Sequence, residues 1–375
     1  METPLFNSRL DKSWLKQLGR EFSRSLVNNA HLGSYLEPFL QSVRPYWTTT
    51  GHRARVLALR DESNEIFTLV LEPVGSWAGF HAGQFVELSL DLDGRRLSRC
   101  FSISSSPSHF AQTGRIELTI RIQEQGRVTP KLRSNLKVGQ FIGLSDAKGD
   151  FQLEQTDSPL LLIAGGSGIT PFRSMLEEMF HQENARDTTL LYYCRAEDSH
   201  LFQPLFESLT NKHSNIKIVC LATSSQGRFQ FGHLLDYCED FQDREIYLCG
   251  PGGLIQLAQS TLTELGVSSE QIHLEHFGPA PVEIGTIAVD SRVLFSNSSK
   301  TIDADSEKPE SILTMAEENG LRPNSGCRMG VCGQCRCTKT SGVVYNTRTG
   351  LHSDTGTETI QLCISVPVGD VTIQL

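Results

Sequence analysis

The segment Leu160-Leu-Leu-Ile-Ala-Gly-Gly-Ser-Gly-Ile-Thr-Pro171 decides the fold of the middle of this chain. Its first five residues form a strand-sized apolar run, the glycines form a turn, and a helix starts after them. Such a turn places the free N–H groups of a helix N-terminus beside a phosphate. The pattern is not G-x-G-x-x-G, so alone it fits a plain strand–helix connection as well as a nucleotide site.

Strand-like and helical segments alternate around this turn, across residues 156–278. A second glycine turn, Leu248-Cys-Gly-Pro-Gly252, follows the fourth strand. Alternation at this spacing predicts βαβ units and a parallel sheet. The expected strands are Leu160–Ala164, Thr189–Cys194, Ile216–Ala222, Glu245–Cys249 and Ile272–His276, and the expected helices are Pro171–His181, Leu201–Thr210 and Gly253–Leu265.

Residues 51–155 show a different pattern, with short strands separated by Gly, Pro and Asp. Ile116, Leu118, Ile120 and Ile122 alternate with polar residues, as in a strand with one buried face. The pattern predicts a closed antiparallel β-barrel, interrupted by one short helix at about Thr129–Leu136. The expected strands are Arg53–Leu59, Ile66–Leu71, Gln84–Leu90, Leu97–Ser104, Arg115–Ile122 and Phe141–Ser145.

Four cysteines dominate residues 286–375. Cys327, Cys332 and Cys335 have the spacing C-x4-C-x2-C, and Cys363 follows after 27 intervening residues. This is the plant-type [2Fe–2S] spacing. The alternative, a structural zinc site, usually draws on two paired-ligand knuckles, and only one C-x2-C pair is present. We expect Gly326, Gly330 and Gly333 to let the loop wrap closely around a cluster, and the nearby Cys337 to be a buried bystander.

The whole-chain composition limits the function classes. The chain has 375 residues with 34 basic and 43 acidic side chains, a net charge of −9 that argues against nucleic-acid binding. The region 156–285 alone holds seven basic and seventeen acidic residues. No apolar run approaches the roughly 20 residues of a membrane span, and the N-terminus lacks a signal peptide's apolar core. We therefore expect a cytoplasmic protein whose ten cysteines serve metal or redox chemistry.

The N-terminal extension, residues 1–50, contains a predicted amphipathic helix at 8–28. Leu10, Trp14, Leu18, Phe22 and Leu26 share one face, and basic residues repeat on the opposite face. Two interpretations stay open. The apolar face packs on the protein's own body, or the helix lies peripherally on the anionic inner face of the membrane.

Read in chain order, these motifs resemble the ferredoxin–NADP reductase superfamily, in the three-module form with a C-terminal plant-type ferredoxin of the β-grasp fold. The resemblance covers about residues 51–375. It implies an FAD-binding β-barrel at 51–155, an NAD(P)-binding α/β domain at 156–278, a linker at 279–285 and a [2Fe–2S] ferredoxin domain at 286–375. It also implies that NAD(P)H gives a hydride to the flavin and that electrons leave singly through the cluster.

Two segments carry the flavin resemblance. Arg99-Cys-Phe-Ser102 is similar to the family's Arg-x-Tyr-Ser motif, which implies that Arg99 binds flavin phosphate, Phe101 stacks on the ring and Ser102 contacts N5. Phe101 replaces the family's Tyr, so one hydroxyl is missing. Gly126-Arg-Val-Thr129 resembles the pyrophosphate turn, with Gly126, Val128 and Thr129 as the expected contacts, which favours FAD over FMN.

The two glycine turns carry the nucleotide resemblance. By it, Gly165, Gly166, Gly168, Thr170 and Pro171 hold the pyrophosphate. Cys249, Gly250 and Pro251 lie beside the nicotinamide.

Three residues near the ends of the second and third strands bear on the choice of nucleotide. Arg195, Ser224 and Arg228 suit a 2′-phosphate, which favours NADPH over NADH. Alternatively, Arg195 pairs with Glu197 or Asp198.

The reacting centre needs no protein nucleophile on this interpretation. Ser102 and Cys249 are the expected catalytic residues, lining the site of hydride transfer. Glu275-His-Phe277 resembles the family's last strand, whose acidic or aromatic residue approaches the flavin.

The sequence leaves alternatives open for the protein that accepts the electrons. Segment 36–55 and the basic helix resemble reductase partners of membrane diiron fatty-acyl desaturases, so we expect such a partner and a role in fatty acid desaturation. The alternative is a reductase component of a soluble aromatic-ring dioxygenase or hydroxylase. A different class of function, that of a non-catalytic redox carrier or sensor, requires a nucleotide site that no longer functions.

Overall fold

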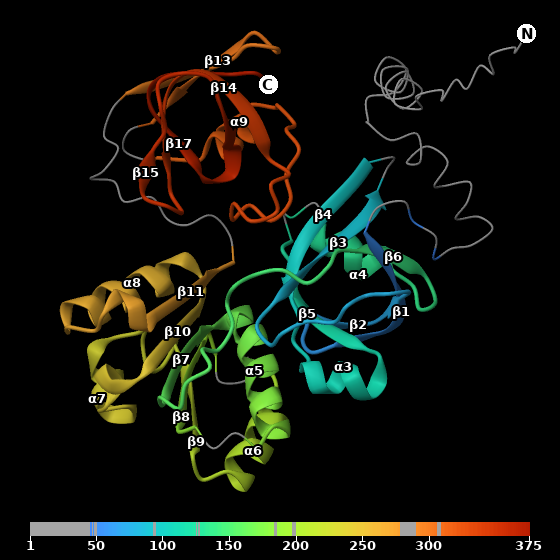
Figure 1. The fold of residues 1–375 in the computed structure, drawn as a ribbon, viewed down its shortest axis with the longest axis vertical. Helices are drawn as coiled ribbons and strands as arrows, with labels where there is room; N and C mark the ends of the chain where they lie inside the picture. Colours follow the sequence, from blue (N-terminus) through green and yellow to red (C-terminus); the bar gives the residue numbers. More distant parts are fainter. Residues whose placement is uncertain are drawn as a thin grey trace, which may run out of the picture.

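Three β-sheets follow one another along the chain in the computed structural model (Figure 1). The structure describes residues 46, 48, 51–92, 95–124, 126, 128–183, 186–196, 200–277, 290–305 and 309–375. The expected helix at 8–28, most of the segment 36–55 and the linker at 279–285 therefore lie outside the described residues. No helix among the described residues is long and apolar enough to cross a membrane.

The first sheet, the barrel module, is antiparallel in the order β4-β3-β6-β1-β2-β5, as the alternating pattern predicts. Beyond β4, the Ser104 N–H bonds the Glu117 carbonyl on β5 at 2.8 Å, so the two ends of the sheet meet. Its strands are β1 (His52–Asp61), β2 (Ile66–Val74), β3 (Phe85–Leu92), β4 (Arg95–Ser102), β5 (Ile116–Arg121) and β6 (Phe141–Leu144).

The barrel module contains two helices among its described residues, α3 (Pro107–Thr113) and α4 (Thr129–Asn135), where the sequence predicts one. Seven residues are too few for α3 to show helical periodicity. Its ends are nevertheless encoded. The Ser106 side chain accepts from the His109 N–H, Pro107 starts the helix, and Gly114 ends it at φ 69°.

The second sheet, the parallel-sheet module, has the order β11-β10-β7-β8-β9 with every pair parallel. Its strands are β7 (Leu160–Gly165), β8 (Thr188–Cys194), β9 (Ile216–Ala222), β10 (Glu245–Gly250) and β11 (Ile272–His276). Its helices are α5 (Ile169–His181), α6 (Gln203–Lys212), α7 (Phe231–Tyr237) and α8 (Gly252–Glu264).

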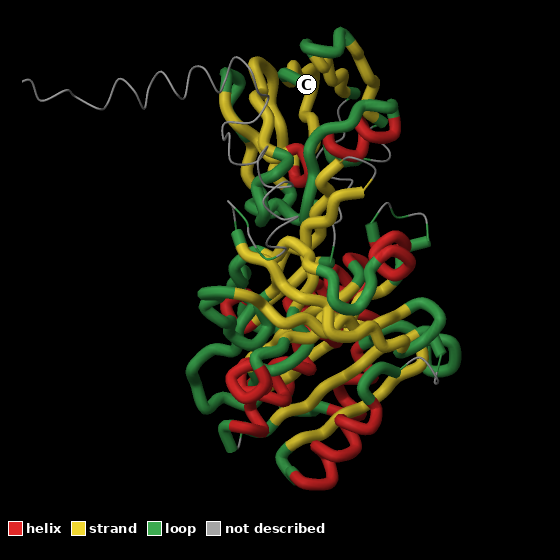
Figure 2. The backbone as a smooth tube through the Cα atoms, turned by 90° about the vertical axis from the view of Figure 1, so that its right-hand side faces the viewer, coloured by secondary structure: helices red, strands yellow, loops and turns green. Residues whose placement is uncertain are grey.

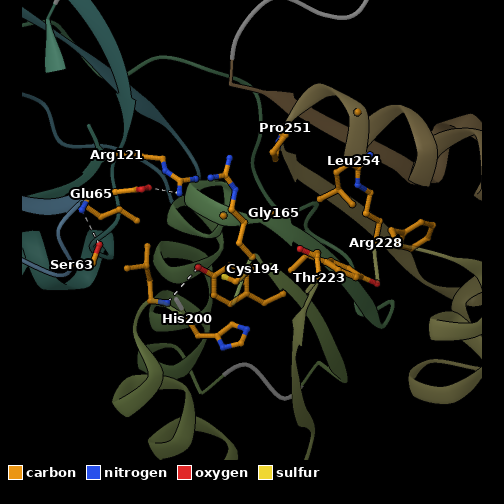
Figure 3. A pocket seen from close by; sticks show the side chains of 18 of the residues that line it. Ser63, Glu65, Arg121, Gly165, Cys194, His200, Thr223, Arg228, Pro251 and Leu254 are labelled. Carbon is orange, nitrogen blue, oxygen red and sulfur yellow. Dashed lines mark hydrogen bonds and ion pairs between the residues drawn. The ribbon is translucent and has the colours of Figure 1, made fainter. Parts of the chain in front are cut away.

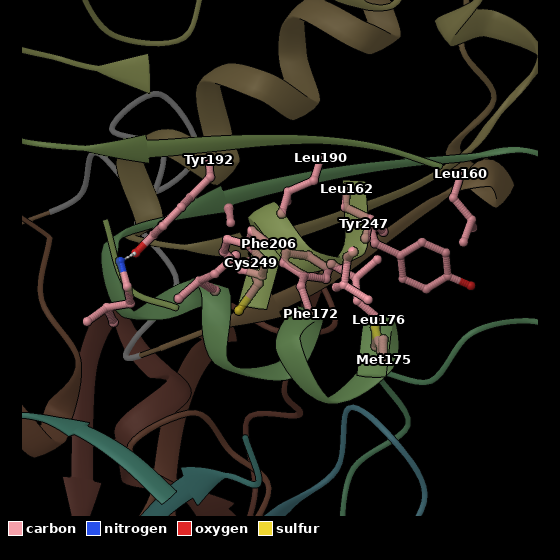
Figure 4. Packing of buried hydrophobic residues seen from close by; sticks show 14 of the residues in the cluster. Leu160, Leu162, Phe172, Met175, Leu176, Leu190, Tyr192, Phe206, Tyr247 and Cys249 are labelled. Atoms are coloured by element: carbon pink, nitrogen blue, oxygen red, sulfur yellow. Dashed lines mark hydrogen bonds between the residues drawn. The ribbon is translucent and has the colours of Figure 1, made fainter. Parts of the chain in front are cut away.

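Both faces of this sheet are covered, which explains the continuous apolar run in β7. Leu160, Leu162 and Ala164 join the core beneath α5 and α6, shown in Figure 4. Leu161 and Ile163 point the other way, into the core beneath α7 and α8. Each buried leucine or isoleucine contributes roughly 1.5–3 kcal/mol to folding, so β7 anchors both halves of the module.

The third sheet, the C-terminal module, is mixed in the order β13-β12-β17-β14-β15, with β16 on β14. β12 and β17 are parallel and the other pairs are antiparallel. The elements are β12 (Ser291–Phe295), β13 (Lys300–Ala304), α9 (Ile312–Glu318), β14 (Arg336–Asn346), β15 (Leu351–His352), β16 (Glu358–Gln361) and β17 (Ser365–Ile373). Cys335 and Cys363 share the core with α9.

A buried ionic network joins the barrel module to the parallel-sheet module. Glu117, on the polar side of β5, is 6% exposed. It bonds Arg60 at 2.6 Å within the barrel and Arg173 of α5 at 2.9 Å across the interface. The two guanidinium groups outweigh burial and hold the pKa of Glu117 below its usual value. Both faces of β5 are therefore buried, although apolar and polar residues alternate along it.

The C-terminal module lies against the barrel module at the end of the molecule seen at the top of Figure 2. The Gln334 amide, between two of the cysteines, donates a hydrogen bond to the Glu87 carboxylate on β3. The cysteine loop therefore faces the barrel sheet.

Candidate functional site

The two glycine turns of the parallel-sheet module pack directly against each other. β7 and β10 are neighbours, with Ala164 opposite Cys249. A Cβ on Gly168 would lie 2.2 Å from the Cys249 carbonyl oxygen, and one on Gly165 would lie 2.8 Å from Pro251 Cδ. Side chains at either position would force the turns apart, so the glycines are needed for this packing as well as for any ligand.

A cavity of about 700 Å³ opens at the carboxyl ends of β7, β8 and β9 (Figure 3). Five of the predicted nucleotide residues line it: Gly165, Gly166, Arg195, Arg228 and Pro251. Ligands of open α/β sheets bind at this edge. The cavity and its basic residues therefore fit a dinucleotide.

The remaining predicted nucleotide residues are not part of the described lining of this cavity, and one of them, Thr170, lines a second cavity instead. The Ser224 backbone N–H bonds the Arg195 carbonyl at 3.1 Å. Thr170 is buried and its hydroxyl donates to the Ser167 carbonyl at 2.9 Å, while Pro171 is buried in α5. Glu197 and Asp198, the alternative partners of Arg195, lie outside the described residues. Arg195 does act electrostatically on Glu65 of the barrel module, whose main partner is Arg121 at 2.8 Å.

A second cavity, of about 630 Å³, opens between the modules and is called here the flavin cavity. All the predicted flavin residues line it: Arg99, Phe101, Ser102, Gly126, Val128 and Thr129. A Cβ on Gly126 would lie 2.8 Å from the Gln123 carbonyl oxygen, and the Thr129 hydroxyl accepts from the Gln123 N–H at 2.8 Å. The predicted pyrophosphate turn is thus a tight, closed turn in the cavity wall.

Residues of all three modules form the wall of the flavin cavity. Glu275 and Phe277 come from the last strand of the parallel-sheet module and the residue after it, as the family resemblance predicts. Cys327, Arg328 and Met329 come from the cysteine loop. A flavin in this cavity would therefore have the nucleotide cavity on one side and the cysteine loop on another.

A buried carboxyl lies where the predicted catalytic residues meet. The Ser102 hydroxyl donates to Glu275, whose Oε2 has no hydrogen-bond partner among the described residues. Burial raises the pKa of Glu275 to about 8, so this side chain is largely neutral at pH 7 and can donate a proton. Cys249 is fully buried in the core beneath α5 and α6, where burial and the Glu275 charge raise its pKa well above the usual value. A thiol in this state is a packing group and not a nucleophile.

The four predicted metal ligands form two pairs. Cys335 Sγ lies 3.2 Å from Cys363 Sγ, and the Cys327 N–H lies 3.3 Å from Cys332 Sγ. Hydrogen bonds link the side chains of Cys327 and Cys332 as well. In the described part of the chain, no three His, Cys, Asp or Glu side chains converge on a single metal ion. The arrangement in two pairs is compatible with the predicted [2Fe–2S] cluster.

The cysteine loop supplies hydrogen bonds to sulfur. The N–H groups of Met329, Val331 and Cys332 point at Cys327 Sγ at 3.4, 3.4 and 3.3 Å. A Cβ on Gly326 would lie 2.8 Å from Cys332 Sγ, as close wrapping requires. Such donors favour the deprotonated, metal-binding sulfur. Cys337, by contrast, directs its thiol to the Gln374 carbonyl at 3.3 Å.

Sequence reasoning missed the contacts that join the modules. Glu87, Cys100 and Gln334 were not singled out, because strands and loops far apart in the sequence bring them together. Arg328 was also missed. It adopts φ 61° in the cysteine loop and bonds the Glu317 carboxylate at 2.7 Å. The only sequence signal for Cys100 and Gln334 was their position inside recognised motifs.

Comparisons with known families agree with this division of the chain. The Oxidoreductase FAD-binding domain family matches residues 60–153, and the Oxidoreductase NAD-binding domain family matches residues 162–260. The 2Fe-2S iron-sulfur cluster binding domain family matches residues 295–368, a range that contains all four cysteine ligands. The chain therefore carries FAD-binding, NAD-binding and 2Fe–2S modules.

Two curated relatives match over most of the chain. An NADPH oxidoreductase of Mycobacterium tuberculosis is 28% identical over 344 residues, covering 90% of this chain and 88% of that protein. A glycine betaine monooxygenase reductase subunit of Pseudomonas aeruginosa is 28% identical over 358 residues, covering 87% of this chain and 96% of that protein.

Solved structures also match over all three modules. Phthalate dioxygenase reductase, described as a modular structure for electron transfer from pyridine nucleotides to [2Fe–2S], matches with a TM-score of 0.58 and 23% identity. The match covers 86% of this chain and 97% of that one, and it shows the shared fold.

Glu275 gives a pH-dependent prediction. Its pKa of about 8 lies above the ordinary 4.5, so between these values the folded chain holds a proton that the unfolded chain has lost. Stability then falls as pH rises, by up to roughly 1.4 kcal/mol per pH unit. Glu275→Gln removes the ionisable carboxyl and with it this loss of stability. The melting temperature of the variant minus that of the wild type should therefore increase from about pH 5 to pH 8.

The control for this measurement is Glu264→Gln, which changes an exposed carboxylate at the end of α8. This variant should keep the wild-type slope. Parallel curves of melting temperature against pH for the wild type and Glu275→Gln would contradict the buried-proton assignment.

Proposed function

We propose that this chain, an oxidoreductase of the ferredoxin-reductase type with FAD-binding, NAD-binding and 2Fe–2S modules, passes electrons from NADPH to an oxygen-activating partner protein. The observation that carries the proposal is the shared wall of the flavin cavity, which contains Ser102, Glu275 and the cluster ligand Cys327. The proposed sites for the nucleotide, the flavin and the cluster are therefore adjacent in one chain. The relatives named glycine betaine monooxygenase reductase subunit support this reading.

The proposed roles of the side chains follow from their positions. Arg99 and the turn at Gly126, Val128 and Thr129 hold the two phosphates of FAD, and Phe101 packs on its ring. Ser102 orients the reacting edge through its hydrogen bond to Glu275, while the buried Cys249 excludes water behind the nicotinamide. When bound, the cofactors supply hydride transfer from the nucleotide to the flavin and one-electron transfer through the cluster.

The proposed nucleotide preference is NADPH over NADH. Arg195 and Arg228 lie in the lining of the nucleotide cavity and carry the charge that a 2′-phosphate needs. Ser224 lies beside Arg195, whose carbonyl accepts a hydrogen bond from the Ser224 backbone N–H. The name of the mycobacterial relative, NADPH oxidoreductase, supports the same choice.

The proposed acceptor is a membrane diiron fatty-acyl desaturase. What supports this finer proposal is sequence alone, namely the basic amphipathic segment 8–28 and the segment 36–55. The alternative acceptor, a soluble oxygenase, is supported by the relatives named glycine betaine monooxygenase reductase subunit. A sensor without turnover would need a disabled nucleotide site, whereas both glycine turns are intact and packed together.

The test compares acceptors in the presence of purified full-length protein and NADPH. We expect NADPH-driven reduction of cytochrome c, and acyl-chain desaturation when membranes containing a histidine-rich diiron desaturase are added. Replacing the basic residues Lys12, Lys16, Arg20 and Arg24 with Gln should reduce transfer to the membrane enzyme several-fold and leave cytochrome c reduction unchanged. Transfer to a soluble ring-hydroxylating oxygenase but not to the desaturase would overturn the proposed acceptor.

A matched control for the relay is Cys332→Ser. It should abolish the cluster's electron paramagnetic resonance signal and electron delivery to the acceptor, while NADPH still bleaches the flavin. Loss of flavin bleaching as well would contradict a modular relay. No turnover by wild-type protein that contains both flavin and cluster would contradict the reductase function itself.

Arg228 gives a separate prediction for nucleotide choice. Arg228→Ala removes a positive charge from the nucleotide cavity, so the KM for NADPH should rise roughly tenfold, the equivalent of about 1.4 kcal/mol. The KM for NADH should change little, because NADH carries no 2′-phosphate. Steady-state reduction of cytochrome c with each nucleotide measures both values. An unchanged preference would show that Arg228 does not bind the 2′-phosphate.

A further inference from the structure

A cross-strand pair on the barrel sheet faces the cysteine loop. Glu87 on β3 lies opposite Cys100 on β4 in the antiparallel register, so the two side chains share one face of the sheet. The Glu87 carboxylate accepts a hydrogen bond from Gln334, which lies between the ligands Cys332 and Cys335. This contact fixes the loop over the pair.

The Cys100 thiol makes the second contact of this pair. It is half-buried, lines the flavin cavity beside Cys327, and forms a side-chain hydrogen bond with Cys327. A cysteine that binds iron has lost its proton. When Cys327 binds iron, only Cys100 of this pair keeps a proton to donate, and it lies beside Cys327 in the wall of the flavin cavity.

The donors to Cys327 Sγ come from two modules. Cys327 Sγ already accepts N–H groups from Met329, Val331 and Cys332 of its own loop. Cys100 adds a donor that does not belong to the loop. Hydrogen bonds to ligand sulfur spread its negative charge, which favours the reduced cluster and raises the reduction potential.

We propose that Cys100, carried by the flavin-motif strand of the barrel module, donates a hydrogen bond to Cys327 and thereby tunes the [2Fe–2S] cluster of the C-terminal module. Cys100 is a positioning and tuning residue, not a cluster ligand. Because the donor and the cluster belong to different modules, the higher potential exists only while the cysteine loop rests on Glu87 and Cys100. The inference rests on the proposed function, since the potential matters only if the cluster relays electrons.

The test is the Cys100→Ala variant of the full-length protein with flavin and cluster bound. We expect a cluster midpoint potential more negative than that of the wild type, and changed g-values in the electron paramagnetic resonance spectrum of the dithionite-reduced protein. The flavin absorption spectrum and the iron content should stay unchanged. A potential and g-values equal to the wild type, at full iron content, would overturn the proposal.

Two more variants separate hydrogen bonding from packing. Cys100→Ser keeps an O–H donor and should recover most of the potential lost in Cys100→Ala. A potential as negative as that of Cys100→Ala would mean that packing, not hydrogen bonding, sets the value, and would overturn the assignment. Cys220→Ala, a half-buried cysteine on β9 of the parallel-sheet module, is the matched control and should keep wild-type values. These readouts need no NADPH and no acceptor, so their failure is distinguishable from a failure of the proposed function.

Discussion

The arrangement of the three modules depends on contacts made by four consecutive residues of β4, numbers 99 to 102. Arg99 and Phe101 line the flavin cavity, Ser102 donates to Glu275 of the parallel-sheet module, and Cys100 donates to Cys327 of the C-terminal module. Side chains alternate across a strand, so neighbouring residues can serve different partners. One short strand thereby connects the three modules at the place where a hydride arrives and single electrons leave.

The rest of the fold holds the other two modules against this strand. The Glu117–Arg173 ion pair, backed by Arg60, fixes α5 on the barrel sheet. The N-terminus of α5 carries the first glycine turn, and that turn is held by close packing against the turn at Cys249 and Gly250. Two contacts therefore set the position of the nucleotide cavity relative to the flavin cavity. One is the buried Glu117–Arg173 ion pair between the barrel sheet and α5, and the other is the close packing of the two glycine turns, which Cβ atoms would prevent. Each charge of the ion pair also has a second partner, because Glu117 pairs with Arg60 at 2.6 Å and Arg173 pairs with Glu177 at 2.9 Å.

The sequence predicted what local patterns encode. Alternation of apolar and polar residues indicated the antiparallel sheet, and alternation of strand-like and helical segments indicated the parallel sheet. Cysteine spacing indicated a [2Fe–2S] cluster, which the match to the 2Fe-2S family over residues 295–368 supports. Contacts between modules could not be predicted. In the sequence, Cys100 looks like an ordinary strand residue, because its contact with the cysteine loop exists only in the folded chain. Glu117 and Thr119 alternate with the apolar residues of β5, yet both are buried, because Glu117 pairs with Arg173 of α5 and Thr119 bonds Thr68 and Ser104. The seven-residue α3 was missed because its signal lies only in its caps.

The most direct test of the relay is anaerobic stopped-flow mixing of the full-length protein with NADPH, following the absorbance of the cluster at several protein concentrations. If β4 joins the flavin and the cluster within one chain, the cluster should be reduced after the flavin in a first-order step whose rate does not depend on protein concentration. A rate that rises in proportion to protein concentration, or a cluster that stays oxidised beside a reduced flavin, would contradict the account.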